Sequence, residues 1–169
     1  MNLSDQIRSL ENSGDAIHDL LAATTTKQAR WKPSPEKWSL LEILCHLVDE
    51  ERDDFRHRVS STLADPGREW PPIDPEGWAR DRNYNDRDFQ EALTAFRQER
   101  TESLVWLGDL GDVDWDRAYR HPLLNELRAG DLLAAWVTHD ILHLRQLTSV
   151  LLAYVEQQAA PYSTRYALP

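Results

Sequence analysis

Helical spacing is clearest in residues 39–59, which read SLLEILCHLVDEERDDFRHRV. The first four residues, Ser39 to Glu42, match a capping box, in which the serine accepts from a free N–H and the glutamate reaches back. Apolar side chains then recur at helical intervals, at Leu40, Leu41, Leu44, Leu47, Val48, Phe55 and Val59. Because Pro66 and Gly67 follow, the pattern predicts an amphipathic helix over about residues 40–62.

Three more segments show helical periodicity, and the alternation typical of strands is nearly absent. The predicted helices cover about residues 3–23, 86–108 and 131–157. Gly14 interrupts the first, and an acidic cap at Asp86 or Asp88 begins the second. The sequence therefore predicts an all-α fold, a four-helix bundle in one domain over residues 1–169.

The connection at residues 63 to about 85 has no periodicity and holds four prolines. A connection of this length in a compact domain is usually a functional loop or a disordered linker. Trp70 and Trp78 argue against disorder, since disordered segments have few aromatic residues. We expect an ordered loop folded over one end of the bundle, with both tryptophans as candidates to cap a metal cleft.

Composition excludes several classes of protein. The chain has 169 residues, one cysteine and a formal net charge of −10. A single cysteine rules out an internal disulfide and favours a reducing, cytoplasmic compartment. The acidic balance disfavours nucleic acid as a partner. No apolar run approaches a membrane span, and the N-terminus does not read as a secretory signal.

His139 and His143 are the strongest indication of chemistry. They lie four residues apart, so on a helix their imidazoles project from one face and can bind one metal ion. They fall near the edge of the same apolar stripe as Trp136 and Leu147, where neutral imidazoles need partners. On the same helix, Asp140 and Gln146 are candidates to orient the ligands.

His46 allows two interpretations. It lies nearly opposite the leucine stripe of its helix, beside Glu50, and the spacing alone favours a surface histidine. If that flank instead borders a cleft against the last helix, His46, His139 and His143 would form a three-histidine site with open positions. Glu50 could then orient an imidazole. Cys45 points away from His46, so we interpret it as a small buried residue.

Two stretches of the sequence form a recognisable pair: residues 38–49, WSLLEILCHLVD, and residues 139–147, HDILHLRQL. Together they resemble the DinB-like family, especially its YfiT-like branch. Their order, their separation and the long Pro/Trp connection also resemble that family, over roughly residues 5–157.

The resemblance implies one divalent metal ion per chain, zinc or nickel, held by His46, His139 and His143. It also implies a homodimer and a transferase that uses a low-molecular-weight thiol of the bacillithiol or mycothiol type, with the metal holding the thiolate. The partners would be that thiol and an electrophilic substrate. The sequence assigns no further catalytic residue.

Two alternatives stay open at the level of sequence. A haemerythrin-like di-iron sensor would use His46 and Glu50 as one His-x-x-x-Glu element, but no later His-x-x-x-x-Asp element follows His143. A non-catalytic stress-response binding bundle would share the fold without turnover.

Overall fold

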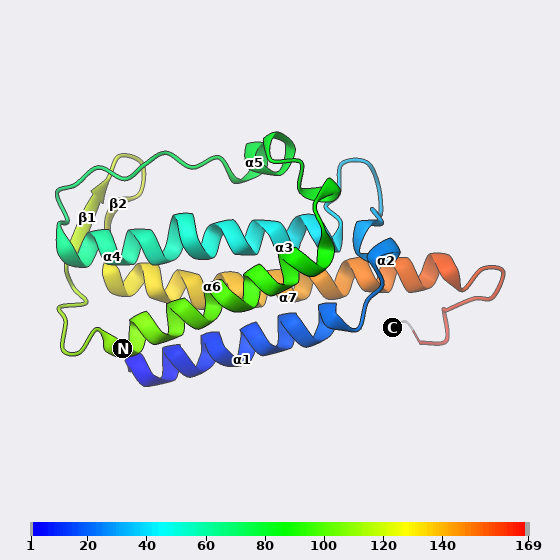
Figure 1. The fold of residues 1–169 in the computed structure, drawn as a ribbon, viewed down its shortest axis with the longest axis horizontal. Helices are drawn as coiled ribbons and strands as arrows, with labels where there is room; N and C mark the ends of the chain where they lie inside the picture. Colours follow the sequence, from blue (N-terminus) through cyan, green and yellow to red (C-terminus); the bar gives the residue numbers. More distant parts are fainter. Residues whose placement is uncertain (1, 168–169) are drawn as a thin grey trace.

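The computed structural model describes residues 2–167 and confirms the four-helix bundle (Figure 1). Its long helices are α1 (Leu3–Ala22), α3 (Leu40–Asp49) continued into α4 (His57–Ala64), α6 (Phe89–Asp109) and α7 (Ala129–Gln158). A π-helical segment, Glu50–Arg56, joins α3 to α4 without a break. A short helix, α2 (Thr26–Arg30), lies between α1 and α3.

The predicted caps are present. Ser39 Oγ accepts from the Glu42 N–H at 3.1 Å, and the Glu42 carboxylate accepts from the Ser39 N–H at 2.7 Å. Asp88 accepts from the N–H groups of Gln90 and Glu91. These bonds satisfy amide groups that the first turn of a helix leaves free, and they set where α3 and α6 begin.

The direction of the helices explains the long connection. In Figure 1, α1 and α7 run one way, whereas α3–α4 and α6 run the other way. The second and third long helices, α3–α4 and α6, are consecutive in the bundle yet parallel. The segment that connects them must therefore return along the bundle. Our expectation of a loop over one end is therefore wrong: the segment runs along the side of α3–α4.

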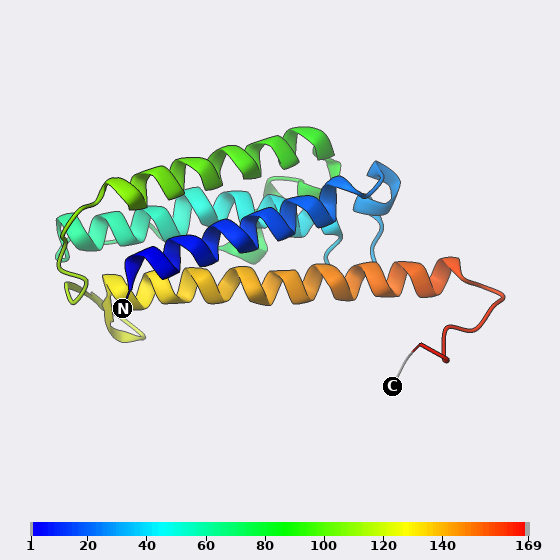
Figure 2. The same cartoon turned by 90° about the horizontal axis from the view of Figure 1, so that it is seen from below.

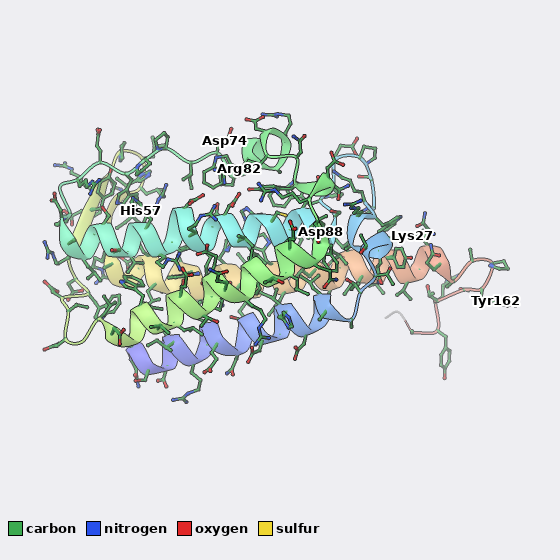
Figure 3. All side chains as sticks on the ribbon, in the orientation of Figure 1. Lys27, His57, Asp74, Arg82, Asp88 and Tyr162 are labelled. Atoms are coloured by element: carbon green, nitrogen blue, oxygen red, sulfur yellow. The ribbon has the colours of Figure 1, made fainter. Side chains whose placement is uncertain are left out.

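This returning segment is partly helical and covers α3. It contains α5 (Pro75–Asp81) and a 3-10 turn at Tyr84–Asp86, and both pack against α3. Figure 3 shows Arg82 reaching from this segment toward the helix. Arg82 donates to the buried Asp49 at 2.5 Å, and the Tyr84 hydroxyl also donates to Asp49. The returning segment thus buries the outer face of α3, and its hydrogen bonds to Asp49 hold α3 in place.

A small hairpin, missed by the sequence analysis, joins α6 to α7. Strands β1 (Ala118–His121) and β2 (Asn125–Arg128) pair antiparallel. Each has four residues, too few to show a clear alternation. Asn125 has φ 62°, in the left-handed region that asparagine tolerates.

The interior has two apolar clusters with a polar layer between them. One cluster includes Ile17, Leu44 and Leu147, and the other includes Leu10, Phe55 and Trp136. The part of the bundle between the two clusters contains buried polar side chains, and each long helix contributes at least one of them. They are Ser13, Glu51, Arg100, Ser103 and Asp140. The elongated bundle is seen from below in Figure 2, where the C-terminal part of α7 extends past the other helices.

No helix in the described part of the chain is both long and apolar enough to cross a membrane.

Candidate metal centre

Three histidines converge between α3 and α7. The Nε2 atom of His46 lies 3.3 Å from that of His139 and 3.1 Å from that of His143. The last two Nε2 atoms are 3.1 Å apart. Among the described residues, these three are the group whose side chains can hold one metal ion.

The triangle of nitrogens fits a metal ion. Zinc binds imidazole nitrogen at about 2.0–2.1 Å in tetrahedral geometry, which places neighbouring ligand nitrogens about 3.3–3.4 Å apart. A neutral imidazole has one N–H, so three Nε2 atoms meeting at one point cannot all be satisfied by each other. A cation at this point would satisfy all three, with the ring protons on Nδ1.

The surroundings keep the three rings neutral and therefore able to bind metal. Burial, with a contribution from the other two histidines, lowers the pKa of His46 to about 2. Burial, His143 and Arg100 lower the pKa of His139 to about 3. Burial also lowers the pKa of His143, although the Gln146 amide acts in the opposite direction.

Aromatic rings fix the positions of the histidines. The ring of Trp38 lies 5.0 Å from that of His46, and the ring of Phe55 lies 5.0 Å from that of His139. Neither Trp38 nor Phe55 was predicted from the sequence to belong to the site. The signal for Trp38 was available, since it directly precedes the cap of the helix that carries His46.

The interpretation of His46 as a surface residue is wrong, because its exposed fraction is 5%. Every residue of α3 is buried. The apolar stripe identified only the face of α3 toward the bundle core. The opposite face is covered by the returning segment and by α7, which approach from distant parts of the chain.

Glu50 lies on the far side of His46 from the nitrogen triangle. Its Oε1 atom is 3.9 Å from His46 Nδ1, and neither of these buried atoms has a hydrogen-bond partner. Burial, and then the neighbouring Asp54, raise the pKa of Glu50 to about 8. A carboxyl group in this position can accept from the Nδ1–H of a metal-binding histidine and fix its orientation. π-Helical turns often occur at functional sites, and Glu50 opens one here.

Asp140 belongs to a buried ion-pair network, which we call the Arg100 network: Arg100, Glu51, Asp140, Ser13 and Trp136. The Arg100 guanidinium donates twice to Glu51, twice to Asp140 and once to the carbonyl of Leu10, at 2.5–3.0 Å. These five bonds use all five of its N–H groups. Ser13 also donates to Asp140, and Trp136 donates to Glu51. Asp140 lies between His139 and His143 on α7. The network therefore fixes the part of α7 that carries both candidate ligands.

A cleft of about 580 Å³ opens beside His143, and we call it the His143 cleft. It lies between residues 33–38 and the C-terminal half of α7. Gln146, a residue predicted to support the site, lines it together with Trp38.

Trp70 and Trp78 lie elsewhere and are not among the residues that line this cleft. Trp70 stacks on Tyr119 of the hairpin, with ring centroids 3.9 Å apart. Trp78 packs under Arg82, whose guanidinium carbon is 4.1 Å from the ring centre. Trp70 thus joins the returning segment to the hairpin, and Trp78 also packs against the larger apolar cluster of the bundle, so both hold that segment in place.

The fold and the histidine triangle define a helical bundle with a candidate metal centre, and sequence comparison places it in a family. Residues 9–147 match the model of the DinB superfamily. This match covers most of the chain, which therefore belongs to the DinB superfamily.

Two relatives extend the comparison. A protein of Oceanobacillus iheyensis named "Putative metal-dependent hydrolase" is 22% identical over 113 residues, which are 67% of this chain and 64% of that protein. YfiT from Bacillus subtilis, described as a probable metal-dependent hydrolase with an unusual four-helix bundle topology, superposes with a TM-score of 0.76. The YfiT match has 18% identity and covers 88% of this chain and 85% of YfiT, so it shows a shared fold.

Proposed function

We propose that this protein is a divalent-metal-dependent enzyme that transfers a low-molecular-weight thiol to an electrophilic substrate. The observation that carries the proposal is the triangle of three Nε2 atoms at 3.1–3.3 Å, with the His143 cleft beside it. A divalent ion held by three histidines keeps an open position and lowers the pKa of a thiol bound there. We further propose zinc or nickel, at one ion per chain, because imidazole suits both.

The chain's own residues would orient the ligands and shape the approach to them. Glu50 faces the Nδ1 atom of His46, and Trp38 and Phe55 hold the rings of His46 and His139. In the transfer step, the thiolate sulfur forms a bond to an electrophilic carbon while the leaving group departs with the electron pair of the broken bond. The thiol proton passes to solvent.

Hydrolysis is a second candidate, favoured by the names that both relatives carry. A metal ion also lowers the pKa of bound water. However, the residues lining the His143 cleft include no carboxylate, and Glu50 lies on the far side of His46. The described lining therefore offers no base to either reaction, so the metal alone would have to ionise the bound group. A thiol, with an ordinary pKa of about 8.5 against about 15.7 for water, ionises there more readily. For this reason we place thiol transfer first.

The di-iron alternative has little support in the described residues. A second ion would need further ligands close to the triangle, and Glu50 faces the opposite nitrogen of His46. Elemental analysis distinguishes the thiol transferase from the di-iron sensor. We expect one metal ion per chain for the transferase and two irons per chain for the sensor.

The test uses protein loaded with zinc, nickel or cobalt. Thiol transfer predicts formation of a thioether from 1-chloro-2,4-dinitrobenzene and a small thiol, with release of chloride, and a change in the cobalt absorption spectrum when the thiol is added. His139→Ala should lose both signals. Hydrolysis predicts instead cleavage of p-nitrophenyl acetate without any thiol, and that result with no thioether product would overturn our first choice.

We also propose that the protein is a homodimer. Ile141, Leu152 and Val155 are about half exposed and share one face of α7 at helical spacing. An exposed apolar face of this kind is typical of an interaction surface. Light scattering after size exclusion should give twice the 19.6 kDa chain mass, and Leu152→Glu should shift it toward one chain mass.

A further inference from the structure

The His143 cleft has a charge opposite to that of the whole protein. The chain carries 29 acidic and 19 basic residues. Yet the cleft is lined by two cations, Lys37 and Arg145, and by no acidic residue. In the described part of the chain, neither cation has a carboxylate within 4.0 Å.

Several arginines elsewhere in this molecule are paired with carboxylates. Arg52, Arg82 and Arg100 each contact one or more carboxylates. Glu36, the acidic residue next to Lys37 in the chain, accepts a hydrogen bond from Ser34 and makes no ion pair within 4.0 Å in the described residues. Its own backbone N–H and Ser34 lower the pKa of this carboxyl most, and Lys32 and Lys37 add to that effect. Lys37 and Arg145 come from separate segments, the 33–38 loop and α7, and line one cleft that also contains the candidate metal ligand His143.

The rest of the lining is largely apolar. Trp38, Pro33, Leu142 and Val150 contribute side chains that can contact a hydrocarbon or aromatic body. Gln146 and Ser149 supply polar groups, although the Ser149 hydroxyl already donates to the Arg145 carbonyl at 2.7 Å. A pocket of mostly apolar walls with a few placed polar groups is the usual form of a small-molecule site.

We propose that the small molecule on which the metal centre acts is an organic anion. Its apolar body lies against Trp38 and Leu142, its anionic group pairs with Lys37 and Arg145, and its reactive group lies toward His143. This inference rests on the proposed function for the reaction, but the preference for an anion can be measured without it. Since the net charge of the protein repels anions, a preference for one must come from local groups.

The test is calorimetric binding of 3-phenylpropanoate and of its neutral isostere, 3-phenylpropanamide, to the metal-free protein. Removing the metal prevents the carboxylate from binding to it directly. We expect the anion to bind about fivefold to tenfold more tightly, as two partly exposed ion pairs would give. Equal affinities in the wild-type protein would overturn the proposal.

Variants identify the groups responsible. Lys37→Gln with Arg145→Gln should make the two affinities equal and leave the amide unchanged. The matched control is Lys27→Gln with Arg68→Gln, two exposed cations outside the cleft, and it should keep the wild-type ratio. All four positions are at the surface, so folding should be retained, and circular dichroism checks it. An unchanged ratio in the first double variant would also overturn the proposal.

A second arm separates this inference from the proposed function. Zinc-loaded protein is assayed for thioether formation with 3-mercaptopropanoate and with 3-mercaptopropanamide. If neither thiol is used but calorimetry shows the anion preference, the anion site stands and thiol transfer fails. If both are used at equal rates and calorimetry shows no preference, thiol transfer stands and the anion site fails.

Discussion

Two buried polar clusters adjoin each other in this bundle, because His139 and Asp140 are consecutive residues of α7. In the Arg100 network every N–H of the guanidinium has a protein acceptor. In the histidine triangle, three nitrogens face each other, and the Nδ1 atoms of His46 and His143 have no partner. One cluster is complete in protein atoms, and the other needs a ligand.

The difference shows how to tell structure from function among buried polar groups. Burying a charge is costly unless it is paired and hydrogen-bonded, so a saturated cluster is explained by the fold it supports. A cluster of unsatisfied groups is not explained in that way. The predictions below test this comparison, beginning with the largest effect.

Arg100→Met should destabilise the metal-free protein by about 3–5 kcal/mol, because it leaves two buried carboxylates without their partner. Gly14 packs closely against this arginine, because a Cβ on Gly14 would lie 3.1 Å from Arg100 Cγ. The arginine side chain therefore fills its surroundings tightly. Urea unfolding followed by circular dichroism measures the change. A loss below about 1 kcal/mol would show that the network is not structural and would break the comparison.

His139→Ala should remove metal binding. At a zinc concentration about 100 times its Kd, the wild-type protein should gain about 2.7 kcal/mol in free energy of unfolding, and the variant should gain far less. His57→Ala is the control, because His57 lies on α4 outside the triangle (Figure 3). The same zinc response in wild type and His139→Ala would mean that the triangle is not the metal site.

Glu50→Gln should flatten part of the pH dependence of stability. The pKa of Glu50 is raised to about 8, above the value of an exposed glutamate. The folded state therefore holds a proton that the unfolded state releases, so stability is full below about pH 4 and falls as pH rises through 8. We expect the variant to remove part of that fall in metal-free protein, because glutamine cannot release a proton. Urea midpoints at pH 5 and pH 8.5 measure it, and identical curves would contradict the expectation.

Ser39→Ala measures how much stability one ordinary local contact contributes, for comparison with the two clusters. Losing the cap of α3 should cost about 1 kcal/mol in free energy of unfolding. Metal content should stay the same, since the cap lies outside both clusters. A loss of metal in this variant would mean that the start of α3 positions His46 more directly than the two clusters suggest.

Much of the fold follows from local patterns. The capping box at Ser39, the acidic cap at Asp88 and the apolar spacing predicted helices that lie close to those observed. The His139–His143 pair was readable for the same reason, because residues four apart on one helix share a face whatever surrounds them. The hairpin at residues 118–128 was missed, since strands of four residues carry too little pattern.

The sequence by itself thus determined where the four long helices lie and that two histidines face one way, but not the short helices α2 and α5. Only the tertiary structure decided the rest. It buried His46, paired Arg100 with Glu51 and Asp140, and sent the returning segment along α3 instead of over one end. It also brought Lys37 and Arg145 to one cleft. These features join residues from 33 to more than 100 positions apart. A periodic pattern within one helix reports only on the face of that helix, not on which distant segment covers it.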